Sequence, residues 1–334
     1  MKAVILAAGY GSRLQPFTSF RPKHMLPVAG KYVLERGINY IRDVLEIDDI
    51  ILVVGYLRNA IMEYFGSGSK CGVNLKYVIQ HSTDKRGLAA ALALVEDHIH
   101  SDFVLYLADN LFEANLKLVV ENHFENSNHA TLHVEKNSNP SRFGVVVIDD
   151  NYKVIRVVEK PRNPPSNLVI SGFYVFSPLI FKYIKQVTPS SRGEYELTDA
   201  IQLMINDNAR IYASMIEGWR QDIGRPEDLL EANQKYLSSG HGKNLGKIID
   251  SQIVEPVYIH PNAKVVNSKI GPYVMLESSV EVINSEIKKA VILEKTKIVN
   301  SQLKEAIIGA QSKIEELNAK NIIAGDFTRI NSCK

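Results

Sequence analysis

The sequence predicts an α/β fold in which a mostly parallel sheet wrapped by helices is followed by a short parallel β-helix. Two observations lead to this prediction. Strand-like and helix-like stretches alternate over residues 1–236, and a short motif then repeats at nearly fixed spacing. Alternation of this kind is typical of a parallel sheet covered by helices. Aliphatic residues that recur about every six positions are typical of a β-helix.

The first part of the chain is divided by its apolar runs. Lys2–Leu6 ends at a glycine-containing loop, Val33–Val44 has helical spacing, and Ile50–Val54 is entirely apolar, as a strand covered on both faces should be. We also expect strands at 75–79 and 103–107 and a helix at 88–95. Ligands of such sheets collect at the carboxyl ends of the strands, so the loops after Leu6 and Leu107 are the expected site.

The character of the sequence changes after residue 236. Ser238–Gly246 is small, polar and glycine-rich, and we interpret it as part of a linker. Beyond it, an Asn/Asp-Ser-x-Ile/Leu motif starts at Asp250, Asn267, Asn284 and Asn300, hence at intervals of 17, 17 and 16 residues. An irregular run of edge strands would not produce this spacing.

Within the repeats, we expect the aliphatic residues to form an internal column that includes Ile259, Val265, Ile270, Leu276, Val282 and Ile287. The predicted organisation is an α/β domain over residues 1–236, a linker over 237–246, a β-helix over 247–318 and a C-terminal tail over 319–334.

Composition argues against several classes of protein. The chain has 39 lysine and arginine residues and 37 aspartate and glutamate residues, so its formal net charge is 39 − 37 = +2. A charge so near zero predicts neither a nucleic-acid-binding nor a membrane-binding surface. Cys71 and Cys333 are the only cysteines and form neither a disulfide framework nor a metal-ligand spacing, so a reducing, cytoplasmic setting is expected. The apolar run at the N-terminus is too short for a membrane span and is followed at once by glycines, which favours a strand over a signal peptide.

The segment from Leu6 to Lys31 carries the strongest chemical signal. Gly9 and Gly11 allow a loop to turn its amides toward a triphosphate, and Arg13 offers a planar fork for phosphate oxygens. Lys23, which follows a proline, is a compact cation suited to a reacting phosphate. An ordinary tight turn would explain two glycines alone. The order GxGSRL-x-P-x-T, with Pro-Lys after it, is much more specific, and it is neither a Walker loop nor a dinucleotide fingerprint.

With further motifs along the chain, this segment resembles the sugar-phosphate nucleotidyltransferase family, and within it the long form of the glucose-1-phosphate thymidylyltransferases. The motifs are YLADN at 106–110, FGVVVIDD at 143–150, VVEKPRNPPSNL at 157–168, GFYVFSP at 172–178, RGEYELTDAIQ at 192–202 and WRQDIGRPEDLLEAN at 219–233. The resemblance implies a Rossmann-like catalytic domain and a left-handed β-helix. It also implies the reaction of dTTP with α-D-glucose 1-phosphate to give dTDP-glucose and diphosphate, with UTP or related hexose 1-phosphates as the alternative.

The resemblance also implies roles for individual residues. Arg13 and Lys23 would stabilise the triphosphate during catalysis, and Asp109 and Asp222 would hold Mg²⁺, which prefers oxygen ligands. The amide of Gln80 can both donate to and accept from the imide edge of thymine or uracil. The implied nucleotide-binding residues are Leu6, Ala8, Gly9, Gly11, Ser12, Arg13, Gln80, Gly87 and Asp109. The implied sugar-phosphate-binding residues are Gly144, Glu159, Lys160, Gly172 and Arg192.

Departures from the thymidylyltransferase pattern leave the base and the sugar open. Residues 80–87 form a stretch about two residues longer than usual, Ala8 and Ala108 stand where glycine is common, and Arg220 stands where an aromatic residue is often found. These departures do not affect the cations or the carboxylates that the reaction needs.

Two other functions stay open at this point. One is a catalytically silent homologue that binds sugar nucleotides, and the other is a bifunctional enzyme whose β-helix also transfers acetyl groups. The repeats contain a single histidine, His260, which we interpret as a loop residue, so we expect the β-helix to assemble a homo-oligomer instead. On this view residues 1–236 retain pyrophosphate release without the β-helix.

Overall fold

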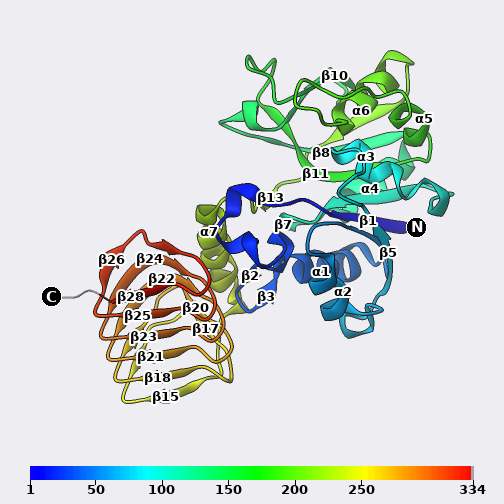
Figure 1. Ribbon diagram of the computed structural model, residues 1–334. Coiled ribbons are helices and arrows are strands. Elements are labelled where there is room, and N and C mark those ends of the chain that lie inside the picture. Colours follow the sequence, from blue (N-terminus) through cyan, green and yellow to red (C-terminus); the bar gives the residue numbers. More distant parts are fainter. Residues whose placement is uncertain (332–334) are drawn as a thin grey trace. The chain divides into compact units, whose positions relative to one another are not determined.

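The computed structural model describes residues 1–331. The chain folds into two compact units, each built from separate stretches of the sequence (Figure 1). The first unit contains residues 1–9 and 34–220, and the second contains residues 10–33 together with the chain from residue 221 onward. The boundaries of these units differ from the domain boundaries expected from the sequence, because residues 10–33 pack with the C-terminal region.

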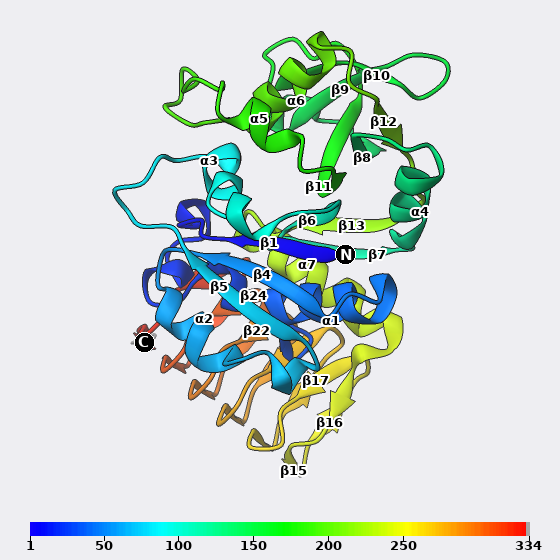
Figure 2. The same ribbon diagram turned by 90° about the vertical axis from the view of Figure 1, so that its right-hand side faces the viewer.

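The first unit is built on a nine-stranded sheet with β1 (Lys2–Ala7) inside it. β1 pairs in parallel with β4 (Asp49–Val54) and β6 (Phe103–Leu107), and β4 pairs in parallel with β5 (Asn74–Ile79) (Figure 2). All four strands were expected from their apolar runs. Because they are parallel, the loops that follow them leave the sheet at one edge.

The other strands extend this sheet on the far side of β6. β11 (Leu168–Phe176) is antiparallel to β6, β8 (Ala130–Lys136) and β9 (Gly144–Ile148), and β9 is antiparallel to β10 (Val154–Glu159). β12 (Ile211–Ser214) runs parallel to β8. Two further strands, β7 (Asn110–Ala114) and β13 (Gly218–Asp222), form a small sheet of their own. The sheet is therefore mixed, with a parallel part that carries the expected loops.

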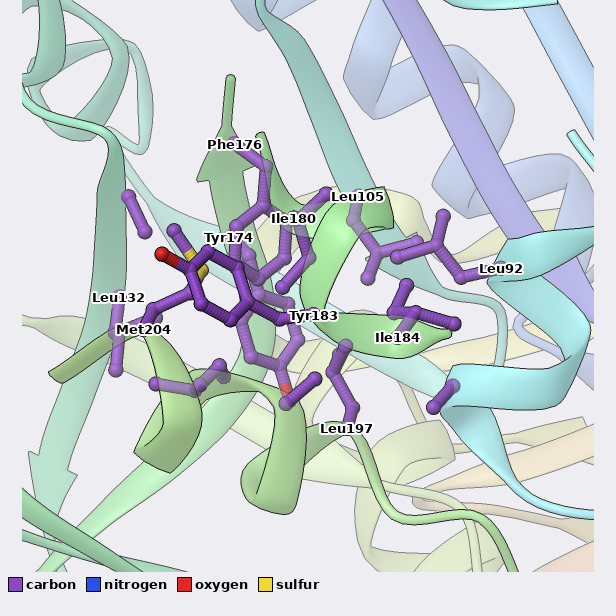
Figure 3. Close-up of a cluster of buried hydrophobic side chains, with 14 of the residues drawn as sticks. Leu92, Leu105, Leu132, Tyr174, Phe176, Ile180, Tyr183, Ile184, Leu197 and Met204 are labelled. Atoms are coloured by element: carbon purple, nitrogen blue, oxygen red, sulfur yellow. The ribbon is translucent and has the colours of Figure 1, made fainter. Parts of the chain in front are cut away.

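Helices cover this sheet through apolar faces. They are α1 (Val33–Leu45), α2 (Arg58–Phe65), α3 (Leu88–Ala93), α4 (Lys117–Glu125), α5 (Ile180–Ile184) and α6 (Leu197–Asn206). In α6, Leu197, Ala200, Ile201 and Met204 are buried at the i, i+3, i+4, i+7 spacing of an amphipathic helix. Figure 3 shows Leu197 and Met204 packed with Tyr174 of β11 and with α5 in the main core.

The C-terminal part of the second unit is a parallel β-helix, in which three ladders of short strands form three faces (Figure 1). Its strands are β14 (Lys243–Asn244), β15 (Lys247–Ile249), β16 (Gln252–Ile253), β17 (Val257–Ile259), β18 (Lys264–Val266), β19 (Lys269–Ile270), β20 (Val274–Leu276), β21 (Glu281–Ile283), β22 (Glu286–Ile292), β23 (Lys297–Val299), β24 (Gln302–Ile308), β25 (Lys313–Glu315), β26 (Asn318–Lys320), β27 (Ile323–Ala324) and β28 (Arg329–Asn331). The six aliphatic residues expected in the internal column are all fully buried.

The repeated Asn-Ser-x-Ile motif forms one corner of the β-helix. Asn267, Asn284 and Asn300 have φ angles of 46°, 49° and 48°, a left-handed conformation that asparagine tolerates better than most residues. Their side chains form a ladder, with Asn267 Nδ2 donating to Asn284 Oδ1 at 2.8 Å and Asn284 Nδ2 donating to Asn300 Oδ1 at 3.1 Å. The Ser285 N–H donates to Ser268 Oγ, one turn earlier, at 3.0 Å. The motif therefore encodes the turn, the contact between turns and the buried column together.

The two segments that flank the expected β-helix are more ordered than the sequence indicated. The linker contains a kinked turn, Leu237–His241, and β14, which pairs with β17. At the other end, β26, β27 and β28 continue the ladders beyond residue 318, where a tail was expected. Residues 332–334, which include Cys333, lie outside the described residues. Among residues 1–331, the helices are all too short or too polar to cross a membrane.

Candidate active site

In the first unit, three of the expected nucleotide-binding residues lie where β1 ends. Leu6 is buried in the strand, Ala8 is half-buried and Gly9 is exposed. The chain passes close to the end of β4 here, since a Cβ atom on Gly55 would lie 2.9 Å from the Ala8 carbonyl oxygen. The loop after β1 is thus confined on the side of β4.

Gln80 and Gly87 bracket the loop that follows β5. The Gln80 N–H donates to Val54 O at 2.8 Å, and its side-chain Nε2 donates to Lys85 O at 3.0 Å, so one of the two donors of the side-chain amide is used within the loop. Gly87 has a φ of 109°, and a Cβ atom there would lie 2.3 Å from Tyr195 O. Only glycine fits this position, directly before α3.

Asp109 follows β6 and is the last member of a chain of hydrogen bonds. Asn110 Nδ2 donates to Asp109 Oδ1 at 3.0 Å, and Asn110 Oδ1 accepts from Arg220 Nε at 2.8 Å. Arg220 Nη1 in turn donates to Glu135 Oε1 at 2.7 Å. Gly172, with a φ of 92°, leaves room for this arrangement, because a Cβ atom there would lie 2.7 Å from Asn110 Nδ2.

Sequence reasoning did not assign a role to Asn110 or Arg220. Asn110 was visible only as the neighbour of Asp109, and Arg220 only as a basic residue where an aromatic one is common. The Arg220 side chain is 7% exposed and lies 5.3 Å from the centre of the Phe143 ring. Its planar fork can satisfy two acceptors at once, which explains why an arginine serves here.

Buried titratable groups lie around the series of hydrogen bonds that joins Asp109 to Glu135. Burial lowers the pKa of His133 to about 4, and the Arg220 charge adds to that effect against an opposing hydrogen bond to Ile216 O. His133 is therefore neutral near pH 7, and its Nδ1 lies 2.7 Å from Ser171 Oγ. Burial also raises the pKa of Tyr174 far above its ordinary value. These two side chains stay uncharged and leave the local field to the carboxylates and Arg220.

The expected sugar-phosphate residues gather around Glu159. Gly144 and Glu159 are directly opposite each other on β9 and β10, and a Cβ atom on Gly144 would lie 3.4 Å from Glu159 Oε2. Thr198 Oγ1 donates to that same oxygen at 3.1 Å, and Lys160 Nζ lies 3.3 Å from Glu159 Oε1. The Glu159 carboxylate is thus oriented by a hydroxyl group and an ammonium group.

Arg192 lies in the same cluster, but it is surrounded by acidic groups. Its Nη2 lies 2.7 Å from Glu196, 3.3 Å from Glu159 and 3.4 Å from Glu194. Burial, with the charges of Glu196 and Glu159, raises the pKa of the neighbouring Asp199. Arg192 thus balances several carboxylates and orients Glu159.

In the second unit, Lys23 lies in close contact with Gly11 of the glycine loop. The segment forms three short 3-10 turns, Ser12–Leu14, Phe17–Ser19 and Lys23–Met25. Gly11 has a φ of 67°, and a Cβ atom there would lie 2.8 Å from Lys23 Cβ and 3.1 Å from Thr18 Cγ2. Thr18 Oγ1 closes the loop by donating to Gly11 O at 2.9 Å. Glycine at position 11 is therefore required both by the backbone angle and by the closeness of Lys23.

Arg13 and Asp222 converge beside Gly224. A Cβ atom on Gly224 would lie 3.3 Å from Asp222 Oδ2 and 3.4 Å from Arg13 Nη2. This turn is fixed by Asp228, whose Oδ2 accepts the N–H groups of Gly224 at 3.0 Å and Arg225 at 2.7 Å, at the start of α7 (Pro226–Tyr236). The structure thus brings a guanidinium and a carboxylate together around a glycine.

The expected residues therefore form two sets, one in each unit. Gln80, Asp109 and the Glu159 cluster belong to the first unit, whereas Arg13, Lys23 and Asp222 belong to the second. Within residues 1–331, no three or more histidine, cysteine, aspartate or glutamate side chains cluster as a metal site. Asp109 and Asp222 supply oxygen donors, the chemistry that suits Mg²⁺.

Comparison with known proteins identifies the family of the chain. The profile of the nucleotidyl transferase family matches residues 2–239. The chain belongs to the nucleotidyl transferase family. Members of this family generally use divalent metal ions. The loop glycines, the basic residues and the mixed α/β sheet described above all lie within the matched residues.

Similar relatives in this family differ in their substrates. The chain is 45% identical over 237 residues to the UTP–glucose-1-phosphate uridylyltransferase AglF of Haloferax volcanii, covering 70% of this chain and 96% of that protein. It is 39% identical to the bifunctional protein GlmU of Methanococcus aeolicus, covering 78% of this chain and 60% of that protein. It is 35% identical to a glucose-1-phosphate thymidylyltransferase of Streptomyces antibioticus, covering 76% and 71%.

Solved structures agree with the fold over more than two thirds of the chain. A Bacillus anthracis protein assigned as a glucose-1-phosphate thymidylyltransferase, crystallised with sucrose, is 33% identical, with a TM-score of 0.64 over 74% of this chain and 98% of its own. A UDP-glucose pyrophosphorylase in complex with UDP-glucose is 26% identical, with a TM-score of 0.65 over 71% and 98%. The nucleotidyltransferase fold is thereby established.

Replacing Arg220 tests the chain of hydrogen bonds that ends at Asp109. We expect Arg220→Ala to lower the free energy of unfolding by about 1–3 kcal/mol, because Asn110 and Glu135 lose their donor in a largely buried place. Arg220→Lys should recover only part, since an ammonium lacks the planar fork. Chemical denaturation measures both, with the exposed Arg156→Ala as control. An Arg220→Ala variant as stable as Arg156→Ala would contradict the assignment.

Proposed function

We propose that this protein joins a pyrimidine nucleoside triphosphate to a hexose 1-phosphate and releases diphosphate, with dTTP and α-D-glucose 1-phosphate as the substrate pair. The observation that carries the proposal is the placement of Lys23 against Gly11, where a side chain does not fit, and of Arg13 and Asp222 close around Gly224. Cations on a glycine loop suit a triphosphate. Family membership and relatives that carry glucose-1-phosphate in their names support the sugar phosphate as acceptor.

The reaction needs no nucleophile from the protein. A phosphate oxygen of the sugar 1-phosphate is already anionic and attacks the α-phosphorus in line, and the bond to the leaving diphosphate breaks. Arg13 and Lys23 stabilise the negative charge that spreads over the transferring group. Asp109 and Asp222 would hold Mg²⁺, which when bound neutralises phosphate charge. The protein therefore contributes positioning and electrostatic stabilisation.

Recognition of the sugar phosphate is assigned to the Glu159 cluster. The Glu159 carboxylate, held by Thr198 and Arg192, accepts hydroxyl groups of the hexose, and Lys160 reaches its phosphate. Gly144 gives the sugar access to the backbone of β9. Arg192 acts mainly by holding Glu159 in place, because three carboxylates already surround its guanidinium.

UTP is the second candidate for the nucleotide, and one observation favours it. The identity to the AglF uridylyltransferase, 45%, exceeds the 35% identity to the Streptomyces thymidylyltransferase. The two bases share the imide edge that Gln80 would read and differ in one methyl group. A catalytically silent homologue is disfavoured because Arg13, Lys23, Asp109 and Asp222 are all present.

For the β-helix, we propose that its flat faces assemble a homo-oligomer. Acetyl transfer, as in a bifunctional enzyme, is the competing possibility, and the match to GlmU covers only 60% of that protein. Acetylation of glucosamine 1-phosphate by the full chain would decide in favour of the second activity.

Removing either cation should slow turnover greatly. We expect Lys23→Ala and Arg13→Ala each to lose about 10²- to 10³-fold in kcat, the usual effect of deleting one group that stabilises a transition state. Pyrophosphate release with Mg²⁺, dTTP and glucose 1-phosphate provides the measurement. Lys31→Ala, an exposed lysine of the same segment, serves as the control. Near-normal turnover in Lys23→Ala would exclude it from catalysis.

The two aspartates should act as a pair. If Asp109 and Asp222 share one Mg²⁺, Asp109→Asn and Asp222→Asn will each raise the Mg²⁺ concentration needed for half-maximal rate, and the double variant will be little worse than either. Chelation with EDTA should abolish the wild-type rate. The exposed Asp150→Asn is the control. Fully additive losses would mean that the two carboxylates do separate work.

A grid of triphosphates and sugar phosphates tests the substrate assignment. We expect dTTP and UTP to be used well above CTP and purine nucleotides, because the proposed substrate is a pyrimidine whose imide N–H and carbonyl pair with the amide of Gln80. Gln80→Ala should flatten this preference while the sugar preference stays. Equal use of purines by the wild type would reject the pyrimidine assignment, and an unchanged profile in Gln80→Ala would assign base reading to the backbone near Gly87.

A further inference from the structure

The segment that carries Arg13 and Lys23 is attached to the last turns of the β-helix. Arg21 lies between these two residues in the sequence. Its Nη2 donates to Asp326 Oδ2 at 2.8 Å, and its Nη1 lies 3.6 Å from Glu294 Oε2. Asp326 is almost completely buried, with its side chain 2% exposed. The ion pair therefore links two positions that are 305 residues apart in the sequence.

Packing contacts accompany this ion pair. Phe20 and Phe327, the neighbours of Arg21 and Asp326, form an edge-to-face pair with ring centres 5.4 Å apart. Beside them, a Cβ atom on Gly325 would lie 2.8 Å from the ring of Pro16. The segment thus contacts the last turns of the β-helix at Pro16, Phe20 and Arg21, three positions that lie between the two cations in the sequence.

The other end of the segment is attached as well. β2 (Pro27–Val28) and β3 (Lys31–Tyr32) form a hairpin beside α7 (Figure 1). The Ala29 N–H donates to Asn233 Oδ1 at 3.0 Å, and a Cβ atom on Gly30 would lie 2.1 Å from the Tyr258 ring of the β-helix. Residues 10–33 are thus held at both ends by their own unit.

The charges around Arg21 are arranged to keep it in place. Glu277 is buried next to Glu294, and burial, together with a hydrogen bond to Glu294, raises the pKa of Glu277 to about 8. The carboxylates that Arg21 contacts are those of Glu294 and Asp326. Asp326 is itself fixed, because its Oδ1 accepts the Ala310 N–H at 2.8 Å.

We propose that Arg21 is a positioning residue for nucleotidyl transfer, and that its ion pair with Asp326 makes the last turns of the β-helix part of the catalytic apparatus. The proposal rests on the proposed function of Arg13 and Lys23. A displacement of about 1 Å in a catalytic group can cost on the order of 100-fold in rate, so an anchor between two catalytic cations matters. It also changes what a shortened chain should do: removing the β-helix removes the anchor, and residues 1–236 should lose most of the activity that the sequence led us to expect of them.

The test compares full-length variants. We expect Arg21→Ala and Asp326→Asn each to lower kcat by about 10- to 100-fold, with the KM for glucose 1-phosphate unchanged, because the Glu159 cluster is untouched. The double variant should be no worse than the singles, since both remove one interaction. Arg21→Lys, which keeps the charge, should recover part of the rate. Lys313→Ala, which breaks an exposed ion pair with Glu315 on the same β-helix, is the control.

Hydrogen exchange supplies a readout that does not depend on activity. In Arg21→Ala, the amides of residues 11–26 should exchange faster while those of β18 to β23 keep their wild-type rates. A folded Arg21→Ala with wild-type kcat, or with wild-type exchange in residues 11–26, would overturn the proposal. If Arg21→Ala does not fold, the same criteria apply to Arg21→Lys and Asp326→Asn. If the wild type releases no pyrophosphate from any substrate pair, the proposed function fails, and exchange alone then decides whether Arg21 is the anchor.

Discussion

The parallel pairing of β1 with β4 and β6 is the constraint on which the first unit depends. The middle of β1, from Ala3 to Ile5, is completely buried, so the strand cannot shift in register without exposing apolar side chains. Because the paired strands run in the same direction, the loops that carry Ala8, Gln80 and Asp109 all leave at one edge of the sheet. Burial of a short apolar strand thereby decides where polar chemistry can gather.

Around that edge, the polar groups are held by other polar groups. Asp109 is held by Asn110, Asn110 by Arg220 and Arg220 by Glu135, while Glu159 lies within reach of a hydroxyl, an ammonium and a guanidinium. Carboxylates that are partly withdrawn from water, as these are, are costly unless they are paired and hydrogen-bonded. The pairing also fixes the direction in which these carboxylates point.

The β-helix has a second role beyond stacking its own turns. Its repeated corner motif makes a regular column whose buried aliphatic residues pack with one another from turn to turn. The last turns nevertheless carry Asp326 and Phe327, which hold the loop that bears Arg13 and Lys23. A rigid repeat is well suited to this task, because an anchor holds a loop precisely only when the anchor itself is fixed.

By itself, the sequence determined much of the local structure of this protein and indicated its family. Apolar runs predicted β1, β4, β5 and β6, and the Asn-Ser-x-Ile motif predicted the β-helix, because each depends on short-range periodicity. The glycine loop with its arginine and lysine indicated a nucleotide site because this motif is also local in the sequence. Glycines 11 and 87 then proved to be required by positive φ angles and by close backbone or side-chain neighbours, which the spacing of residues could only suggest.

Only the tertiary structure decided which distant residues meet. Arg220 pairs with Asn110 across 110 positions and Arg21 with Asp326 across 305, and no local pattern marks either partner. The division into units is of the same kind, since residues 10–33 follow β1 in the chain but pack with a β-helix that begins more than 200 residues later. Such contacts depend on how whole elements pack, and an ion pair gains its strength only after folding has buried it and fixed both partners.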